Sequence, residues 1–293
     1  MLTNHRLSCF LSLFAILWGL PLCRIAHAEE QPVAAGSTEE APPSAAPEQA
    51  TTPSAAPGNA VANPSDPTHV GFTFYLWFPG VHGTTGVDGR YVGFSASPGD
   101  LLSHFRFGLM GIVTAEHNRW VLLSDFVWVR LQANQQKVLP LPGQPQLSAQ
   151  VKSWQLLVNP EFGYRFLNGE RIKMDALPLG VRFWHLGSSL SFSPSLQGRT
   201  FSGSQNWADP VMGARILFPL SPKTQVTIWG DAGGWGAGAQ LDYNIVGALE
   251  YKLSPKFTLG AGWRYLYVNY ISGTFLYKTA MSGVAAGVQY NFK

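Results

Sequence analysis

The stretch from Ser153 to Phe166 alternates between polar and apolar positions. It reads SWQLLVNPEFGYRF, so its even positions are Trp, Leu, Val, Pro, Phe, Tyr and Phe, while Gln, Asn, Glu and Arg occupy odd ones. A period of two predicts a β-strand, because successive side chains of a strand point to opposite faces. The class of the fold then depends on which face lies inside.

The same alternation recurs along the chain after residue 70. It is clear in the runs 71–78, 179–184, 209–216, 226–233, 240–251, 257–267 and 279–292. Two further runs, 107–116 and 120–131, are strand-like but alternate less regularly. The pattern predicts about ten strands; it also fits eight, if the hairpin 107–131 is shifted or the first strand is peripheral.

The connections between these runs alternate in length. Short ones fall at 117–119, 167–171, 219–223 and 253–256, and longer ones at roughly 79–105, 133–149, 191–205 and 271–277, with a modest one at 235–239. Short turns at one end and long loops at the other, with an even strand number, are typical of transmembrane β-barrels. Tilted strands of about 9–11 residues are long enough to cross a membrane.

Charge decides which face lies inside. A soluble β-sandwich buries its apolar faces and exposes charged ones, yet only 13% of this chain is charged, against about 25% in ordinary soluble domains. The polar faces are rich in glycine, which suits a narrow lumen, and the apolar faces carry aromatic residues near strand ends, like interfacial girdles. We therefore expect an all-β fold, an antiparallel transmembrane barrel whose apolar face meets lipid and whose sheet closes on itself.

Three stretches resemble a known group of proteins. The end of the chain, GVQYNFK, resembles the closing-strand signal of bacterial outer-membrane barrels at Val288, Tyr290 and Phe292, with Lys293 as one extra residue. The stretches WADPVMGAR (207–215) and GDAGGWGAG (230–238) resemble an uncharacterised family of small outer-membrane barrels akin to the opacity and OmpA-like group. The resemblance covers roughly 69–293. It implies the fold, and recognition of the last strand by the barrel-assembly machinery, but no established activity.

The first 28 residues have the pattern of a secretory signal peptide. A short basic start and an apolar run precede Ala26-His27-Ala28, an A-x-A cleavage site. A lipoprotein signal that uses Cys23 is the weaker alternative, because bulky Leu22 stands where such a signal has a small residue. The only two cysteines, Cys9 and Cys23, lie in this segment, so the exported chain has no thiol chemistry.

Residues 29–68 form a second region, rich in Pro, Ala and Ser, with acidic residues as its only charges. Such a composition predicts a disordered periplasmic tether. Eighteen of the twenty Lys and Arg residues and eleven of the seventeen acidic ones lie beyond residue 68, so the predicted barrel (69–293) has a net charge near +7. Since the chain is exported, we expect outer-membrane lipids, including lipopolysaccharide, rather than nucleic acid as partners. The sequence does not specify an oligomeric state.

Charged residues on the predicted inner face are the candidate functional residues. They are Asp125, Glu161, Arg165, Arg182, Asp209, Arg215, Asp231, Asp242, Glu250 and Arg264. Counting from the short turns places six of them at a similar depth: Asp125, Glu161, Arg182, Arg215, Asp231 and Arg264. Buried charges persist when they are paired, and arginine suits this role because its planar fork binds carboxylates at two points. The network either plugs the lumen or forms a charged constriction that selects solutes; the plug is favoured, because narrow barrels are filled by side chains.

Catalytic patterns are weak. No histidine spacing suits zinc, and no G-x-S-x-G elbow occurs. His185 with Ser188 and Ser189 is similar to the site of barrel lipid hydrolases, but the position two residues from the histidine is Gly187, and an amphipathic role near the outer headgroups is favoured. Asp100 and His104 could belong to a barrel protease, although a capped helical turn explains Asp100 better.

The sequence therefore predicts a protein of the bacterial outer membrane that is not an enzyme and binds no cofactor or metal. Its expected role is structural or surface interaction, with the lumen closed by the charged network. The alternative is a narrow channel for small solutes, lined by the same residues.

Overall fold

The computed structural model describes residues 68–87, 90–138, 146–193 and 200–292. The predicted signal peptide and almost all of the predicted tether lie outside these ranges. One helix, α2 (Pro98–Ser103), accompanies the strands β1 (His69–Val87), β2 (Arg90–Ala96), β3 (Phe105–His117), β4 (Trp120–Val138), β5 (Gln146–Asn168), β6 (Lys173–Ser193), β7 (Thr200–Pro219), β8 (Thr224–Gly234), β9 (Leu241–Lys252), β10 (Phe257–Ser272) and β11 (Phe275–Phe292). Within the described ranges, no helix has the length and apolar character needed to span a membrane.

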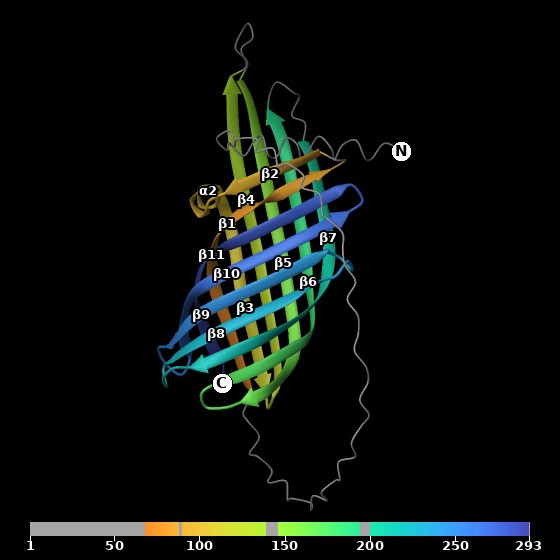
Figure 1. The fold of residues 1–293 in the computed structure, drawn as a ribbon. Helices are drawn as coiled ribbons and strands as arrows, with labels where there is room; N and C mark the ends of the chain where they lie inside the picture. The colour runs from red at the N-terminus through yellow and green to blue at the C-terminus, as the bar shows by residue number, and fades with distance from the viewer. Residues whose placement is uncertain (1–67, 88–89, 139–145, 194–199, 293) are drawn as a thin grey trace, which may run out of the picture. The chain divides into compact units, whose positions relative to one another are not determined.

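The strands form one closed antiparallel barrel (Figure 1). From β3 to β11 each strand pairs with the next, and β11 returns to β1 in a register that runs from Val70↔Phe292 to Gly86↔Leu276. β1 pairs with β3 at its start, which completes a ring of ten strands. β2 pairs only with the second half of β1, from Val81↔Ala96 onward. The predicted antiparallel barrel of about ten strands is confirmed.

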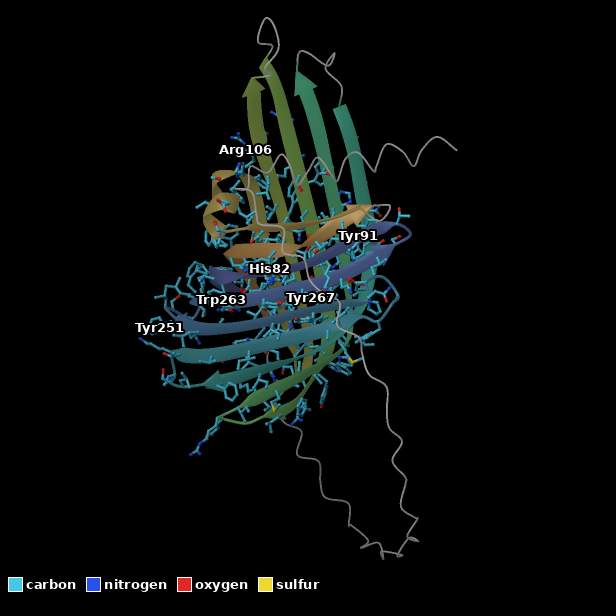
Figure 2. All side chains as sticks on the ribbon, turned by 45° about the horizontal axis from the view of Figure 1, so that its top comes forward. His82, Tyr91, Arg106, Tyr251, Trp263 and Tyr267 are labelled. Atoms are coloured by element: carbon cyan, nitrogen blue, oxygen red, sulfur yellow. The ribbon has the colours of Figure 1, made fainter. Side chains whose placement is uncertain are left out.

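The apolar face of the strands is the outer one. In the opening stretch Phe162, Tyr164 and Phe166 are exposed, whereas Asn159 and Glu161, on the other face, are completely buried. The same holds on later strands, where Trp263 and Tyr251 lie on the outside of β10 and β9 (Figure 2). A continuous apolar exterior around a polar interior inverts the arrangement of a soluble barrel and requires an apolar surrounding.

The short turns lie where they are expected, but two of the longer connections differ. The segment 79–105 is not a loop: β1 runs on to Val87, β2 turns back beside it, and α2 leads into β3. The segment 271–277 is a tight turn, in which Gly273 has a φ of 57° between β10 and β11. At the same end β4, β5, β6 and β7 rise beyond their neighbours (Figure 1), with 19, 23, 21 and 20 residues.

Inward glycines allow neighbouring strands to approach closely. A Cβ on Gly262 of β10 would lie 2.1 Å from the carbonyl oxygen of Gly247 in β9, whereas a Cβ on Gly247 itself would meet nothing within 4 Å. We expect Gly262→Ala to lower the free energy of unfolding by about 1–3 kcal/mol, because the wall must shift to admit the methyl group. Gly247→Ala is the matched control and should change it by less than about 0.5 kcal/mol. Equilibrium urea unfolding in lipid vesicles measures both, and equal effects would contradict the close approach.

Candidate functional site: the layered lumen

Four charged side chains form a cluster near the short turns, hereafter the lower cluster: Glu116, Arg165, Asp175 and Arg215. Asp175 is fully buried and accepts from Arg165 Nε at 2.7 Å and from Arg215 Nε at 2.8 Å. Glu116, whose side chain is 23% exposed, forms ion pairs with the terminal guanidinium nitrogens of Arg165 at 2.9 Å and of Arg215 at 2.6 Å. Two carboxylates and two guanidiniums thus neutralise each other around the lumen.

Arg182 organises the centre of a second group, the central belt. Its guanidinium forms ion pairs with Asp231 of β8 and Asp242 of β9, and all three side chains are completely or almost completely buried. Trp184 Nε1 donates to the second oxygen of Asp242 at 2.8 Å. One arginine therefore joins β6 to β8 and β9, two strands with which β6 is not paired in the sheet.

Arg264 of β10 forms the other half of the belt. It pairs with Asp125 of β4 at 2.7 Å and donates to the hydroxyl of Tyr75 at 2.6 Å, and this hydroxyl donates in turn to Asp125 at 2.6 Å. Asn244 links the halves, because it accepts from Arg264 Nε and donates to Asp231 at 3.1 Å. The belt is one connected network that spans the lumen.

Two buried carboxylates of the belt are held by neutral donors. Glu161 accepts from Asn159 Nδ2 at 2.8 Å. Asp209 accepts from Trp207 Nε1 at 2.9 Å and from the backbone N–H of Ala239. The belt contains five carboxyl groups and two arginines, Arg182 and Arg264, so its net formal charge is negative. The carboxyl groups are those of Asp125, Glu161, Asp209, Asp231 and Asp242.

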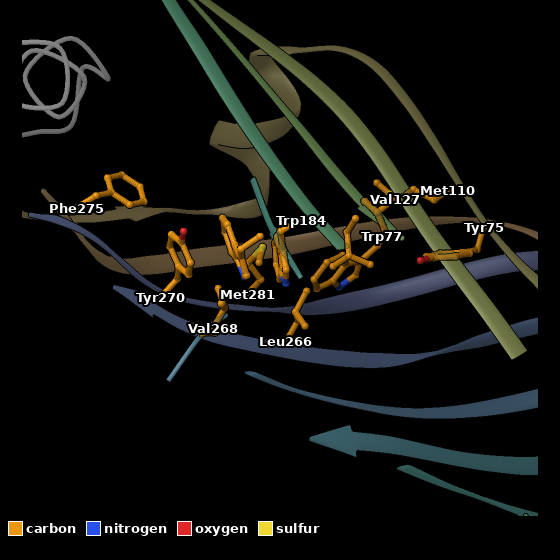
Figure 3. Packing of buried hydrophobic residues seen from close by; sticks show 13 residues of the cluster. Tyr75, Trp77, Met110, Val127, Trp184, Leu266, Val268, Tyr270, Phe275 and Met281 are labelled. Atoms are coloured by element: carbon orange, nitrogen blue, oxygen red, sulfur yellow. The ribbon is translucent and has the colours of Figure 1, made fainter. Parts of the chain in front are cut away.

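Apolar layers separate and cover the charged groups. Below the belt, Leu123 and Leu177 pack with Val121 and Trp229. Above it, the next inward position after four of the belt residues is apolar: Trp77 follows Tyr75, Val127 follows Asp125, Trp184 follows Arg182 and Leu266 follows Arg264. These side chains belong to a larger cluster that extends toward Met281 and Tyr270 (Figure 3). The lumen at belt level is filled by side chains from all sides.

The structure places nine of the ten predicted residues in one of these two groups, with corrections for Arg215 and Glu250. Arg215 does not lie at belt depth: it belongs with Arg165 in the lower cluster, because two register shifts between β5 and β6 and one between β6 and β7 displace the count from the turns. Glu250 joins neither group, since it is half-buried and accepts from Gln225 at 3.1 Å.

Several network residues were missed from the sequence: Tyr75, Glu116, Asn159, Asp175 and Asn244. Glu116 lies in a run whose alternation is irregular, and Asp175 precedes the stretch in which the alternation becomes regular. The other three were on the correct face, but they carry no charge. A search of the inner face for every polar side chain that can bond to a carboxylate would have found them.

The residues of the supposed protease site form a helix cap. Asp100 accepts from both the backbone and the hydroxyl of Ser97, and Ser97 accepts from the backbone of Asp100, which makes a capping box at the start of α2. Hydrogen bonds from Ser97 lower the pKa of the Asp100 carboxyl below its ordinary value. His104 Nδ1 lies 2.8 Å from the carbonyl oxygen of Asp100, at the other end of the helix. The predicted capped turn is confirmed.

His185 lies on the outer face and is held from both sides. Trp154 Nε1 donates to its Nε2 at 2.8 Å, and its Nδ1 bonds to the side-chain oxygen of Asn206. The ring of Trp154 covers Gly187, where a Cβ would lie 2.1 Å from the indole. Both ring nitrogens of His185 are therefore engaged by an indole and an amide rather than by a hydroxyl. Over the described ranges, no group of three or more His, Cys, Asp or Glu side chains is arranged to hold a metal ion.

Comparisons with known proteins bear on the fold alone. No protein-family model and no curated protein matches the chain. Among solved structures, the outer membrane protease OmpT of Escherichia coli has a TM-score of 0.53 and 11% sequence identity, over 79% of this chain and 99% of OmpT. The translocator domain of the autotransporter NalP from Neisseria meningitidis has a TM-score of 0.40 and 13% identity, over 80% of this chain and 91% of that domain. Ail, the attachment invasion locus protein of Yersinia pestis, has a TM-score of 0.31 and 13% sequence identity, over 77% of this chain and 98% of Ail.

The similarity to OmpT shows that the chain has the fold of an outer-membrane β-barrel. At this identity it does not extend to the activity in that protein's name. The uncharacterised subfamily suggested by the sequence is not identified by any family model.

Proposed function

We propose that the protein is a structural or surface-interaction barrel of the bacterial outer membrane, with a lumen that does not conduct. The observation that carries the proposal is the central belt, because Asp125, Arg182 and Asp242 are 0% exposed and engaged in ion pairs. Water and ions cannot pass a level of the lumen at which the charged side chains themselves have no contact with solvent. The network acts as a plug that ties opposite walls together.

The apolar exterior supports the outer-membrane location. A barrel with this exterior leaves no unpaired sheet edge over most of its wall and can span hydrocarbon. In that setting the outer aromatic side chains contact lipid, including lipopolysaccharide, and the last strand is read by the barrel-assembly machinery. The long strands support the second half of the proposal: β4 to β7, at 19–23 residues, exceed the about 9–11 residues that a crossing requires. Their ends extend above the barrel, where they can contact other molecules.

Single-channel recording in a planar bilayer tests the closed lumen. The refolded mature protein should give no steps above the bare bilayer. The triple variant Arg182→Ala, Asp231→Ala, Asp242→Ala removes the centre of the plug together with both of its ion pairs, and it should give frequent openings. Steady steps in the wild-type protein, selective for cations because the belt is acidic, would instead support the solute channel.

A further inference from the structure

The wall of the barrel has a seam between β1 and β3. The two strands pair only from His69↔Glu116 to Phe74↔Gly111. Above this point β3 stays paired with β4 up to Phe105↔Leu131, and β1 is next joined on this side by β2, from Val81 onward. Within the described residues, the part of β1 from Tyr75 to Gly80 therefore has no strand partner on its β3 side.

The seam is bordered by apolar side chains that face outward. Leu76 and Phe78 of β1 are 39% and 40% exposed, and Phe107 and Leu109 of β3 are 43% and 38% exposed. Pro79 lies in the unpaired part of β1. Because proline has no N–H, this position leaves no backbone donor unpaired at the seam. The outer surface thus continues to the edge of the seam without a polar border.

A cavity of about 460 Å³ lies behind the seam, in the upper part of the lumen. Its lining includes inward side chains such as Trp77, Met110 and Met281, together with Leu76 and Phe78 from the outer face. The exposed side chains Leu76 and Phe78 of β1 and Phe105 of β3 belong both to this lining and to the two strands that border the seam, so the cavity reaches the exterior there. No charged residue lines it among the described residues.

The cavity is flanked by α2 and has the central belt as its floor. Leu101 and Leu102 of α2 line its upper edge, where β2 and α2 lie beside β1 (Figure 1). Leu102 is 57% exposed on this well-capped helix. Below, the ring of Trp77 lies 4.8 Å from the guanidinium carbon of Arg264, so the floor rests directly on the central belt. A ligand can enter sideways but cannot continue through the barrel.

We propose that this cavity binds an acyl chain of a membrane lipid, which enters from the bilayer through the seam between β1 and β3. Its volume lies within the roughly 300–1,000 Å³ of ligand pockets. Its lining offers apolar contact without a charge to hold a polar ligand, and its mouth opens onto the face that contacts lipid. The lipid headgroup stays outside, at the level of α2. This site is separate from the closed lumen proposed above: a conducting belt would leave it intact, and an empty cavity would not open the belt.

Photolabelling from the bilayer tests the proposal. The full mature chain is refolded into phosphatidylcholine vesicles that contain a stearic acid with a diazirine near its methyl end, and adducts are mapped by peptide mass spectrometry after irradiation. We expect adducts on inward residues of the cavity, such as Met110 and Met281, in addition to outer-face residues.

Two adjacent serines of β6 supply matched variants. Ser188 lines the cavity, and Ser189 points to the outer face, so Ser188→Phe fills the cavity while Ser189→Phe leaves it open. Labelling of Met110 and Met281 should fall about tenfold in Ser188→Phe and stay at the wild-type level in Ser189→Phe. Both variants must show the wild-type shift in gel mobility on heating, which reports a folded barrel.

Adducts confined to outer-face residues in the wild-type protein would overturn the proposal. So would inward adducts that are equal in the two variants. A third contrary outcome is inward labelling obtained only with a short, water-soluble diazirine acid added outside the vesicles, since it would mean entry from the aqueous side.

Discussion

Replacing Arg182 by methionine should lower the free energy of unfolding by about 3–5 kcal/mol. The substitution leaves Asp231 and Asp242 fully buried opposite an apolar side chain, and an uncompensated charge in the interior is among the most destabilising changes a fold can suffer. The hydrogen bond from Trp184 to Asp242 cannot replace the lost cation. Equilibrium urea unfolding in lipid vesicles, followed by tryptophan fluorescence, measures the loss.

The charges, rather than the volume of the arginine, should account for most of this effect. Adding Asp231→Asn and Asp242→Asn to Arg182→Met removes both unpaired carboxylates and should restore most of the lost stability. Arg171→Met is the control, because Arg171 is exposed in a short turn. Its replacement should change the free energy of unfolding by less than about 0.5 kcal/mol. If the triple variant is no more stable than Arg182→Met, the belt contributes through packing and the ion pairs are incidental.

The fold was predictable because most of it follows from which face of the strands lies inside the barrel. In the stretch around Phe162 and Glu161 the alternation shows two faces, and the scarcity of charge along the chain shows which of them is outside. The count of alternating runs then predicted about ten strands, and the alternating lengths of the connections indicated a transmembrane barrel. The extension of β1 to Val87 was not predictable in this way, because GVHGTTGV contains three glycines and little alternation. Its pairing with β2 and β11 holds it as a strand instead.

The members of the charged network were easier to predict than their partners. Arg182, Asp231 and Asp242 lie on strands with a regular alternation, so their positions in that alternation are enough to place them inside. Partners depend on register, and the bulges near Gly163 and Leu177 shift it. Depth counted from a turn therefore failed for Arg215, whose real partners are Asp175 and Glu116. The seam between β1 and β3 was equally hidden, because a missing pairing leaves no mark on the alternation of either strand.

Replacing Asp175 by alanine should lower the free energy of unfolding by about 3 kcal/mol. Asp175 is fully buried and accepts from both Arg165 and Arg215, so its removal leaves two guanidiniums close together with only Glu116 between them. The expected loss lies at the lower end of the range for broken buried pairs, because Glu116 is 23% exposed and water can reach that side of the cluster. The same urea titration measures it.

A double-mutant cycle separates charge repulsion from the loss of packing. Adding Arg215→Met to Asp175→Ala removes one of the two facing cations, and the pair should couple by about 1–3 kcal/mol. Glu250→Ala is the matched control at the same end of the barrel: Glu250 is half-buried and bonds to the neutral Gln225, so its loss should stay near 1 kcal/mol. Additive effects at Asp175 and Arg215 would mean that these two residues do not interact, with Asp175 holding Arg165 and Glu116 holding Arg215. In that case the lower cluster would be two independent pairs, and only the central belt would tie one side of the barrel to the other.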